Sequence, residues 1–214
     1  MRALRARREK PGFAAFAVAS TTLYPGNTAP DIDVEVTTPL PWSANDEITF
    51  TITATDAEDG PIDPSEISWE ALLYHCYTPD DCHSHPYTEG TGGGTTMEGP
   101  SHGYPSYLAI NATVTDSRGQ TTTVTEDLHP ATAQIEVTSS PPGATVSVGE
   151  HTGTTPFTVT VINRDLLALT VPSPQQIGGV PHVFSSWAHG GAQSQDYLAD
   201  GNSAIHVNLT PTGP

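Results

Sequence analysis

The densest group of coordinating side chains in the sequence lies between Leu73 and Pro86. This stretch contains both cysteines of the chain, Cys76 and Cys82, and three of its nine histidines. In an exported protein, two cysteines this close most simply form a local disulfide. In a reducing cytosol, the same two sulfurs would instead be thiolate ligands for a metal beside the histidines. Both alternatives make this turn the first place to look for chemistry.

The histidines of this region are spaced so that they predict a metal site. His83 and His85 are two residues apart, so an extended segment projects both from one face. A disulfide would also hold His75 near His83, and His102 supplies a fourth imidazole from further along the chain. Three or four neutral imidazoles suit Zn²⁺ or Cu²⁺. The alternative is that the four are polar loop residues, hydrogen-bonded around the turn.

Two acidic turn sequences predict a second ion site. Asp56-Ala-Glu-Asp-Gly60 and Asp116-Ser-Arg-Gly119 each follow a predicted strand. In a β-sandwich such turns can meet at one pole, and Ca²⁺ takes about six to eight oxygen ligands. Alternatively, Asp and Gly are there only because they build turns. The predicted calcium ligands are Asp56, Glu58, Asp59 and Asp116.

A polar and aromatic cluster near the C-terminus is a candidate ligand-binding site. Trp187, His189 and Gln193 surround the pair Gly190-Gly191. A tryptophan beside imidazole and amide groups can stack on a sugar ring. The alternative is that the tryptophan fills the core while the glycines form a turn.

The charge distribution excludes some partners. The chain has 7 basic and 24 acidic side chains, and five of the basic ones lie in the first ten residues. Residues 11–214 therefore carry 2 basic and 23 acidic side chains. Such a body repels nucleic acid and anionic lipid, so neither is an expected partner. No apolar run reaches the roughly 18 residues that span a bilayer, so no membrane span is expected.

The first 26 residues have the order of a secretion signal. A basic stretch precedes the short apolar run Gly12–Ser20, which ends in small residues. We therefore expect an extracellular protein, with a leftover linker as the alternative for this segment. A further alternative is self-assembly, in which residues 11–25 are donated to a neighbouring copy as a strand.

Alternation of polar and apolar residues predicts an all-β fold with no helix of ordinary length. Two tandem β-sandwich-like modules are expected, 27–130 and 131–211, and Trp69 is a predicted core anchor of the first. The glycine-rich stretch 89–96 is expected to be a loop. In the second module, we expect 144–148 to pair with 133–138, and 166–171 with 157–162. The expected strands are 31–36, 47–54, 67–73, 107–114 and 120–126, followed by 133–138, 144–148, 157–162, 166–171, 182–187 and 204–209.

Several motifs carry a resemblance to a known family. The first module has "NTAP", "ATDAEDG", "SWEALLYHC", "CHSHP", "YPSYL" and "ATVTDSRG". These resemble the PKD-type, immunoglobulin-like module at the C-terminal end of secreted PQQ-dependent glucose/sorbosone dehydrogenase-like proteins. The motifs "SSPPGATVSV", "GTTPFTVTV", "VPSPQ" and "FSSWAHGGAQS" resemble the module that follows it there. The resemblance covers residues 27–209 but not the family's catalytic propeller, and it implies a carbohydrate context.

Together these features predict a secreted, non-catalytic accessory or adhesion protein that binds a glycan or cell-surface polymer and is stabilised by metal ions. The sequence has no Gly-x-Ser-x-Gly, P-loop or Rossmann motif. One alternative is a copper or zinc enzyme that uses the four histidines. The other is a structural subunit of an extracellular assembly.

Overall fold

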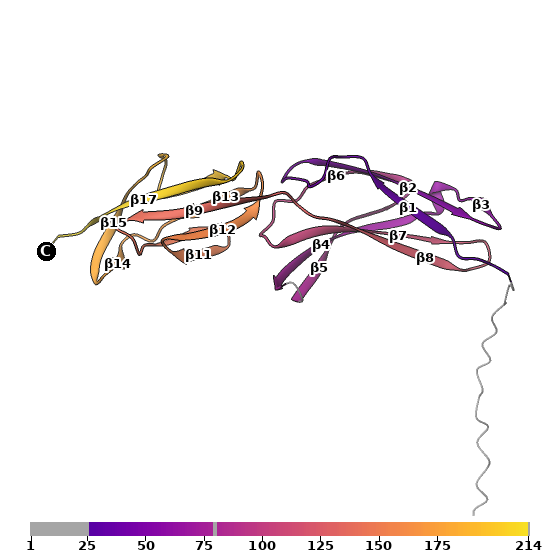
Figure 1. Ribbon diagram of the computed structural model, residues 1–214, viewed down its shortest axis with the longest axis horizontal. Coiled ribbons are helices and arrows are strands. Elements are labelled where there is room, and N and C mark those ends of the chain that lie inside the picture. The colour runs from indigo at the N-terminus through magenta and orange to yellow at the C-terminus, as the bar shows by residue number, and fades with distance from the viewer. Residues whose placement is uncertain (1–25, 79–80, 214) are drawn as a thin grey trace, which may run out of the picture.

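The structure, a computed structural model, describes residues 26–78 and 81–213. These residues form strands joined by turns, and the one helical element described is a 3-10 turn, η1 (Pro64–Glu66). Figure 1 shows two layered β modules arranged end to end. The all-β, sandwich-like fold expected from the sequence is confirmed. Within the described part of the chain, no helix has the length and apolar character needed to cross a membrane.

The first module packs two four-stranded sheets against each other. Alternation in the sequence places Ile48, Phe50 and Ile52 in the core, where each is at most 2% exposed. Phe50 meets Trp69 from the opposite sheet edge-to-face, with ring centroids 5.2 Å apart. One sheet holds β1 (Asp31–Val36), β2 (Glu47–Asp56), β3 (Gly60–Pro61) and β6 (Gly94–Glu98). The other has the order β5 (Asp81–Thr91), β4 (Ser68–Thr78), β7 (Ser106–Thr115) and β8 (Thr121–Leu128).

The glycine-rich stretch 89–96 is not the loop expected from the sequence. β5 continues to Thr91 and β6 begins at Gly94, so only two residues form the turn between them. The glycines are needed because strands approach closely here. A β-carbon on Gly94 would stand 2.2 Å from the carbonyl oxygen of Phe50, and one on Gly90 would stand 2.6 Å from the indole ring of Trp69.

The second module packs a five-stranded sheet on a four-stranded one around its own core. The five-stranded sheet has the order β12 (Phe157–Ile162), β9 (Thr132–Ser140), β17 (Ser203–Pro211), β15 (Val180–Trp187) and β14 (Gln175–Ile177). The four-stranded sheet has the order β11 (His151–Thr154), β10 (Thr145–Val148), β13 (Leu166–Thr170) and β16 (Ser194–Leu198).

Both strand pairings expected in the second module are wrong. β10 pairs with β11 and β13 in the four-stranded sheet, whereas β9 pairs with β12 and, in parallel, with β17. β13 likewise pairs with β10 and β16 and not with β12. The two sheets of the sandwich explain the difference. The chain passes from one sheet to the other after β9 and again after β12, so strands that are adjacent in sequence at these points lie in different sheets.

The junction between the modules is packed. Trp42 is fully buried and its indole N–H donates to the carbonyl oxygen of Leu128 at 2.8 Å. Ile162, at the end of β12, is buried in the core of the first module. Across the same junction, the guanidinium of Arg164 lies 2.5 Å from the carboxylate of Asp46. The two modules are therefore joined by core contacts as well as by the chain.

Candidate functional site

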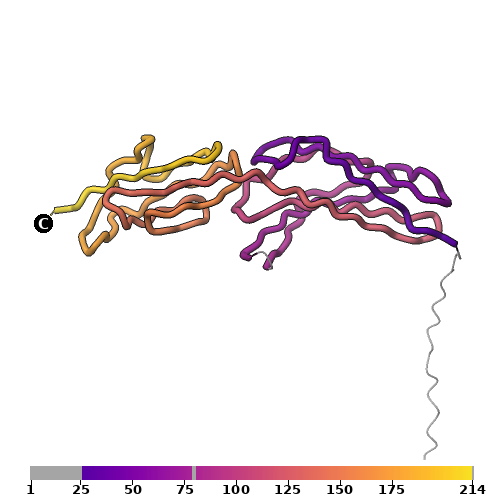
Figure 2. The backbone as a smooth tube through the Cα atoms, viewed as in Figure 1, coloured from indigo at the N-terminus to yellow at the C-terminus, as the bar shows by residue number. Residues whose placement is uncertain are grey.

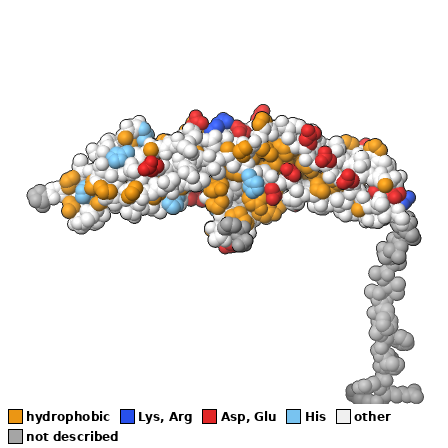
Figure 3. Space-filling view, viewed as in Figure 1, with side chains coloured by type: hydrophobic (Ala, Val, Ile, Leu, Met, Phe, Trp, Pro, Cys, Tyr) orange, Lys and Arg blue, Asp and Glu red, His pale blue; other side chains and the backbone are white. Residues whose placement is uncertain are grey.

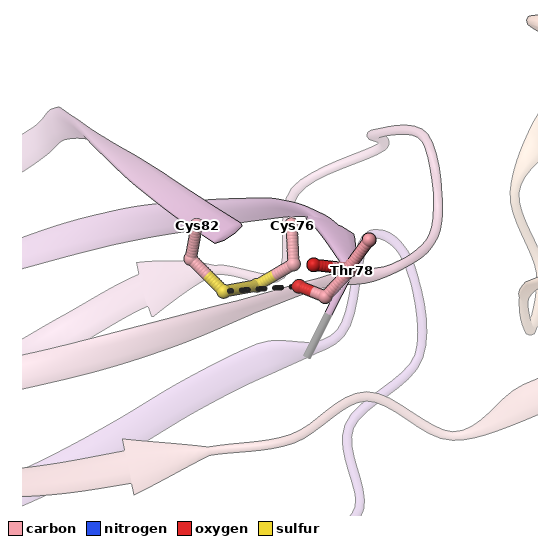
Figure 4. Close-up of a disulfide and its surroundings, with 3 residues drawn as sticks. All are labelled: Cys76, Thr78 and Cys82. Atoms are coloured by element: carbon pink, nitrogen blue, oxygen red, sulfur yellow. Dashed lines mark hydrogen bonds between the residues drawn. A yellow bond between two sulfur atoms is a disulfide. The ribbon is translucent and has the colours of Figure 1, made fainter. Parts of the chain in front are cut away.

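The hairpin formed by β4 and β5 projects from the first module next to the junction (Figure 2). Cys76 and Cys82 lie directly opposite each other in the register of its two strands and are joined by a disulfide (Figure 4). The sulfur of Cys82 also lies 3.9 Å from the carbonyl oxygen of Thr78. Because a disulfide sulfur carries no proton, we regard this as a contact and not as a hydrogen bond. The disulfide ties the two strands together at the tip of the hairpin.

The two faces of this hairpin carry different chemistry. Side chains alternate along a strand, so Tyr74 and Cys76 lie on one face of β4 while His75 lies on the other. His83 is directly opposite His75, and His85 follows it on the same face of β5. The hairpin therefore places the disulfide on one side and the histidines on the other.

The four histidines expected to form a cluster do lie together. The ring centroids of His75 and His102 are 4.8 Å apart, those of His75 and His83 are 5.4 Å apart, and those of His83 and His85 are 4.8 Å apart. Burial, then the neighbouring imidazole of His102, lowers the pKa of His75, and this favours its neutral form. In the described ranges, no group of three or more His, Cys, Asp or Glu side chains is arranged to hold a metal ion. The transition metal remains a prediction.

A groove of about 560 Å³ opens on the other face of the hairpin, and the sequence analysis did not identify it. We call it the tyrosine groove. Tyr104 is 43% exposed, which leaves its ring accessible to a ligand, whereas the ring of Tyr77, a residue 71% exposed, stacks on His83 with centroids 5.4 Å apart. Figure 3 shows hydrophobic side chains gathered over this end of the first module, beside the hairpin. The groove is lined by Cys76, Tyr77, Thr78, Cys82, Tyr104, Pro105, Ser106, Tyr107, Asp127, His129 and Pro130.

Tyr107 lies in the wall of the tyrosine groove, between two other rings. It stacks on Tyr74 with centroids 4.9 Å apart and 9° between the ring planes, and its centroid lies 5.0 Å from that of His129. Burial, then the carboxylate of Asp127, raises the pKa of Tyr107. Its hydroxyl therefore stays protonated at neutral pH and can donate a hydrogen bond, while Asp127 beside it can accept one.

The two turns that carry the predicted calcium ligands meet at the far end of the first module (the acidic pole), although no group of three or more His, Cys, Asp or Glu side chains in the described residues is arranged to hold a metal ion. The carboxylate of Asp59 accepts hydrogen bonds from the backbone N–H and the hydroxyl of Ser117, at 2.9 and 2.8 Å. This contact joins the turn after β2 to the turn after β7. Glu58 accepts the N–H and hydroxyl of Thr28 at 3.1 and 2.8 Å, and these bonds lower its pKa.

Two aspartates of the acidic pole are buried. Burial alone would raise the pKa of Asp116, but hydrogen bonds from Asn27, Gln120 and Arg118 outweigh it and lower the pKa. Asp56 is 6% exposed, and its Oδ1 accepts two backbone N–H groups of its own turn. Its Oδ2 is buried and has no hydrogen-bond partner among the described residues. The other carboxylate oxygens described at this pole accept hydrogen bonds within or between turns, whereas Asp56 Oδ2 accepts none.

The candidate ligand site around Trp187 is not an exposed cluster. Trp187 is 2% exposed, belongs to the core of the second module, and donates its indole N–H to the carbonyl oxygen of Ala192 at 2.9 Å. Gln193 uses its amide to bond the carbonyl oxygen of Val171 at 2.8 Å. His189 and Gln193 are exposed, but the tryptophan is not. The core alternative therefore describes the tryptophan correctly, and a sugar cannot stack on its face.

A second hollow of about 560 Å³ lies on the outer face of the same sheet as the hairpin. Glu70 and Glu89 stand directly opposite each other in its wall, and Asn111 bonds Glu70 at 3.1 Å. This hollow has no exposed aromatic ring to stack on a ligand, unlike the tyrosine groove.

The expected donation of residues 11–25 to a neighbouring copy as a strand lies outside the described residues.

Comparisons with known proteins give one result. Residues 132–174 match the family of the PEGA domain, so the first part of the second module is similar to that domain. No curated protein matches the chain. No solved structure matches it.

Proposed function

We propose that this protein is an extracellular, non-catalytic module that binds a neutral glycan of a cell surface or polymer through the tyrosine groove. The observation that carries this proposal is the set of exposed aromatic rings in the groove. Tyrosine rings stack on the apolar face of a sugar ring, and nearby polar groups fix its orientation. Tyr104 offers an exposed face, and Tyr77, which stacks on His83, is exposed at the edge of the groove. Asp127 and the hydroxyl of Tyr107 offer hydrogen bonds to sugar hydroxyls.

The charge of the protein narrows the ligand to a neutral glycan. Beyond the first ten residues, 23 acidic side chains face only 2 basic ones, and Asp127 lies in the groove itself. A polysaccharide rich in uronate, sulfate or phosphate would be repelled. A neutral sugar bears no such penalty and can still use the carboxylate as a hydrogen-bond acceptor.

The location outside the cell rests on two observations. The disulfide between Cys76 and Cys82 suits an oxidising compartment. PEGA domains are β-rich and often occur in secreted or periplasmic proteins, and residues 132–174 match one. The resemblance of the first module to PKD-type modules of secreted sugar-oxidising proteins agrees with this location and with a carbohydrate ligand.

Calcium at the acidic pole is the second part of the proposal. Asp56 Oδ2 is a buried carboxylate oxygen without a partner, and a buried polar group left unpaired is costly. A bound Ca²⁺ would satisfy it and would offset the repulsion between Asp56, Glu58, Asp59 and Asp116. The ion would stabilise the module and take no part in glycan binding, because the groove is at the other end of the sheet.

The experiment is a glycan array probed with wild type, Tyr104→Ala and His189→Ala. We expect wild type to bind neutral glycans and not uronate-rich or sulfated ones. Tyr104→Ala removes an exposed groove ring and should lose the signal. His189→Ala changes the exposed residue of the cluster near Trp187 and should keep it. Binding that survives Tyr104→Ala, or that fails in His189→Ala, would contradict the tyrosine groove as the site.

A further inference from the structure

The histidine face of the hairpin borders the tyrosine groove at Tyr77, whose ring stacks on His83 with centroids 5.4 Å apart. His75 is the central ring of this face, because it lies 4.8 Å from His102 and 5.4 Å from His83 between centroids. His75 and His83 are direct cross-strand partners. Cross-strand partners hold their β-carbons about 5 Å apart, so the backbone already brings these two imidazoles to one place.

Each of the two ring separations from His75 is compatible with a pair of imidazoles sharing one zinc ion. With Zn–N bonds of about 2.0–2.1 Å and tetrahedral angles, two such rings have centroids about 5 Å apart. The His75–His83 and His75–His102 separations of 5.4 and 4.8 Å are close to this value. Over residues 26–78 and 81–213, no three ligands yet point at a common centre. Binding therefore requires the side chains to move from the positions that they have in this structure.

A carboxylate from the second module completes the set. Glu150 lies in the turn between β10 and β11, next to the loop that carries His102. A β-carbon on Gly103 would stand 2.5 Å from Oε2 of Glu150, so the carboxylate approaches only because Gly103 has no side chain. The charge of Glu150 also acts on the imidazole of His75. This carboxylate therefore faces the histidines from across the junction.

We propose that His75, His83 and His102 of the first module and Glu150 of the second bind one Zn²⁺ ion, which clasps the two modules together. Three imidazoles and one carboxylate make a closed tetrahedral shell, and closed shells are typical of structural and not catalytic zinc. The neutral form of an imidazole is the one that binds a metal.

Zinc titration of the untagged, full-length chain by isothermal calorimetry tests this proposal. We expect saturation at one zinc per chain for wild type, with affinity lowered at least about tenfold in His75→Gln and in His83→Gln. His83 is exposed, so its variant tests the site without disturbing the core. Metal-free thermal melts show which variants are folded. The matched control is His151→Gln, since His151 follows Glu150 directly but packs on Phe157 at 5.2 Å.

Glu150→Gln tests the clasp itself. We expect it to weaken zinc binding about tenfold and to reduce the rise in unfolding temperature that zinc gives wild type. Unchanged affinity in Glu150→Gln would leave the ion on the hairpin alone and overturn the clasp. Absence of saturable binding in wild type, or wild-type affinity in either His75→Gln or His83→Gln, would overturn the site.

Discussion

The phenol rings of Tyr74 and Tyr107 stack across β4 and β7, with centroids 4.9 Å apart and 9° between their planes. Tyr107 lines the tyrosine groove, but Tyr74 does not. The stack therefore fixes the orientation of a ring that a ligand would meet. An aromatic pair of this kind contributes about 0.5–1.5 kcal/mol beyond its buried area.

This relationship predicts that Tyr74→Ala weakens glycan binding although Tyr74 does not line the groove. We expect a loss of about two- to tenfold in affinity, because Tyr107 would sample other rotamers. Tyr74→Phe keeps the ring and should bind like wild type. Affinity electrophoresis in gels containing the glycan measures both. Equal mobility of wild type and Tyr74→Ala, with both folded, would mean that the stack does not shape the site.

Calcium should stabilise the first module. A ligand bound only by the native state raises the free energy of unfolding, by about 2.7 kcal/mol at a hundredfold excess over its Kd. We expect thermal melts in millimolar Ca²⁺ to have a higher midpoint than melts in EDTA. Asp56→Asn removes a charge at the oxygen that has no partner and should abolish the difference.

The control for calcium is Asp63→Asn, an exposed aspartate whose carboxylate only caps η1. This variant should keep the response to Ca²⁺. Identical melts of wild type in Ca²⁺ and in EDTA would remove the calcium site and leave the acidic pole as a pair of turns.

Acid should destabilise the protein partly through Asp116. Its pKa is lower in the folded state, where Asn27 and two backbone N–H groups donate to its carboxylate. The stability that it contributes is present above its unfolded pKa of about 3.9 and is lost as the pH falls toward the folded pKa. Asp116→Asn cannot titrate, so its stability should fall less than that of wild type between about pH 5 and pH 3. Urea unfolding in EDTA at each pH measures the free energy of unfolding of both proteins. If it falls with pH equally in wild type and in Asp116→Asn, Asp116 does not contribute to the acid destabilisation.

Monovalent salt should raise the unfolding temperature even in EDTA. Beyond residue 10 the chain has two basic side chains, Arg118 and Arg164, and Arg164 pairs with Asp46, so attraction between charges is scarce. Repulsion among the 23 acidic side chains beyond residue 10 should dominate. Screening shortens the Debye length from about 8 Å at physiological ionic strength. A midpoint that falls as KCl increases would show that the junction ion pair matters more than the net charge.

Local pattern was sufficient to predict much of the fold. Alternating residues gave the bounds of β1 without error, and they placed Trp69 in the core. β5 was missed because nearly all of its side chains are exposed and therefore show no alternation. Its pairing with β4 follows from the hairpin and not from its own residues. The pairings of β10 and β13 were wrong because the choice of sheet depends on the whole sandwich.

The candidate sites differ in the same way. The histidine cluster and the acidic pole were predictable because spacing on adjacent strands and turns brings their residues together. The tyrosine groove was not, because Tyr77, Tyr104 and Asp127 come from three separate segments. The motif Tyr104-Pro-Ser-Tyr107 was its one visible signal in the sequence. For Trp187 the sequence left both a ligand site and a core position open, because an aromatic residue beside glycines and polar residues looks the same whether it is buried or exposed.

The most direct test of the proposed function is the dissociation constant for the neutral glycan selected on the array, measured by isothermal calorimetry. We compare wild type with Tyr104→Ala/Tyr107→Ala, and with His189→Ala as the control. We predict saturable binding at one site per chain, weakened at least about tenfold by the double substitution and unchanged in the control. A double variant that is folded and binds with the wild-type constant would contradict glycan binding in the tyrosine groove.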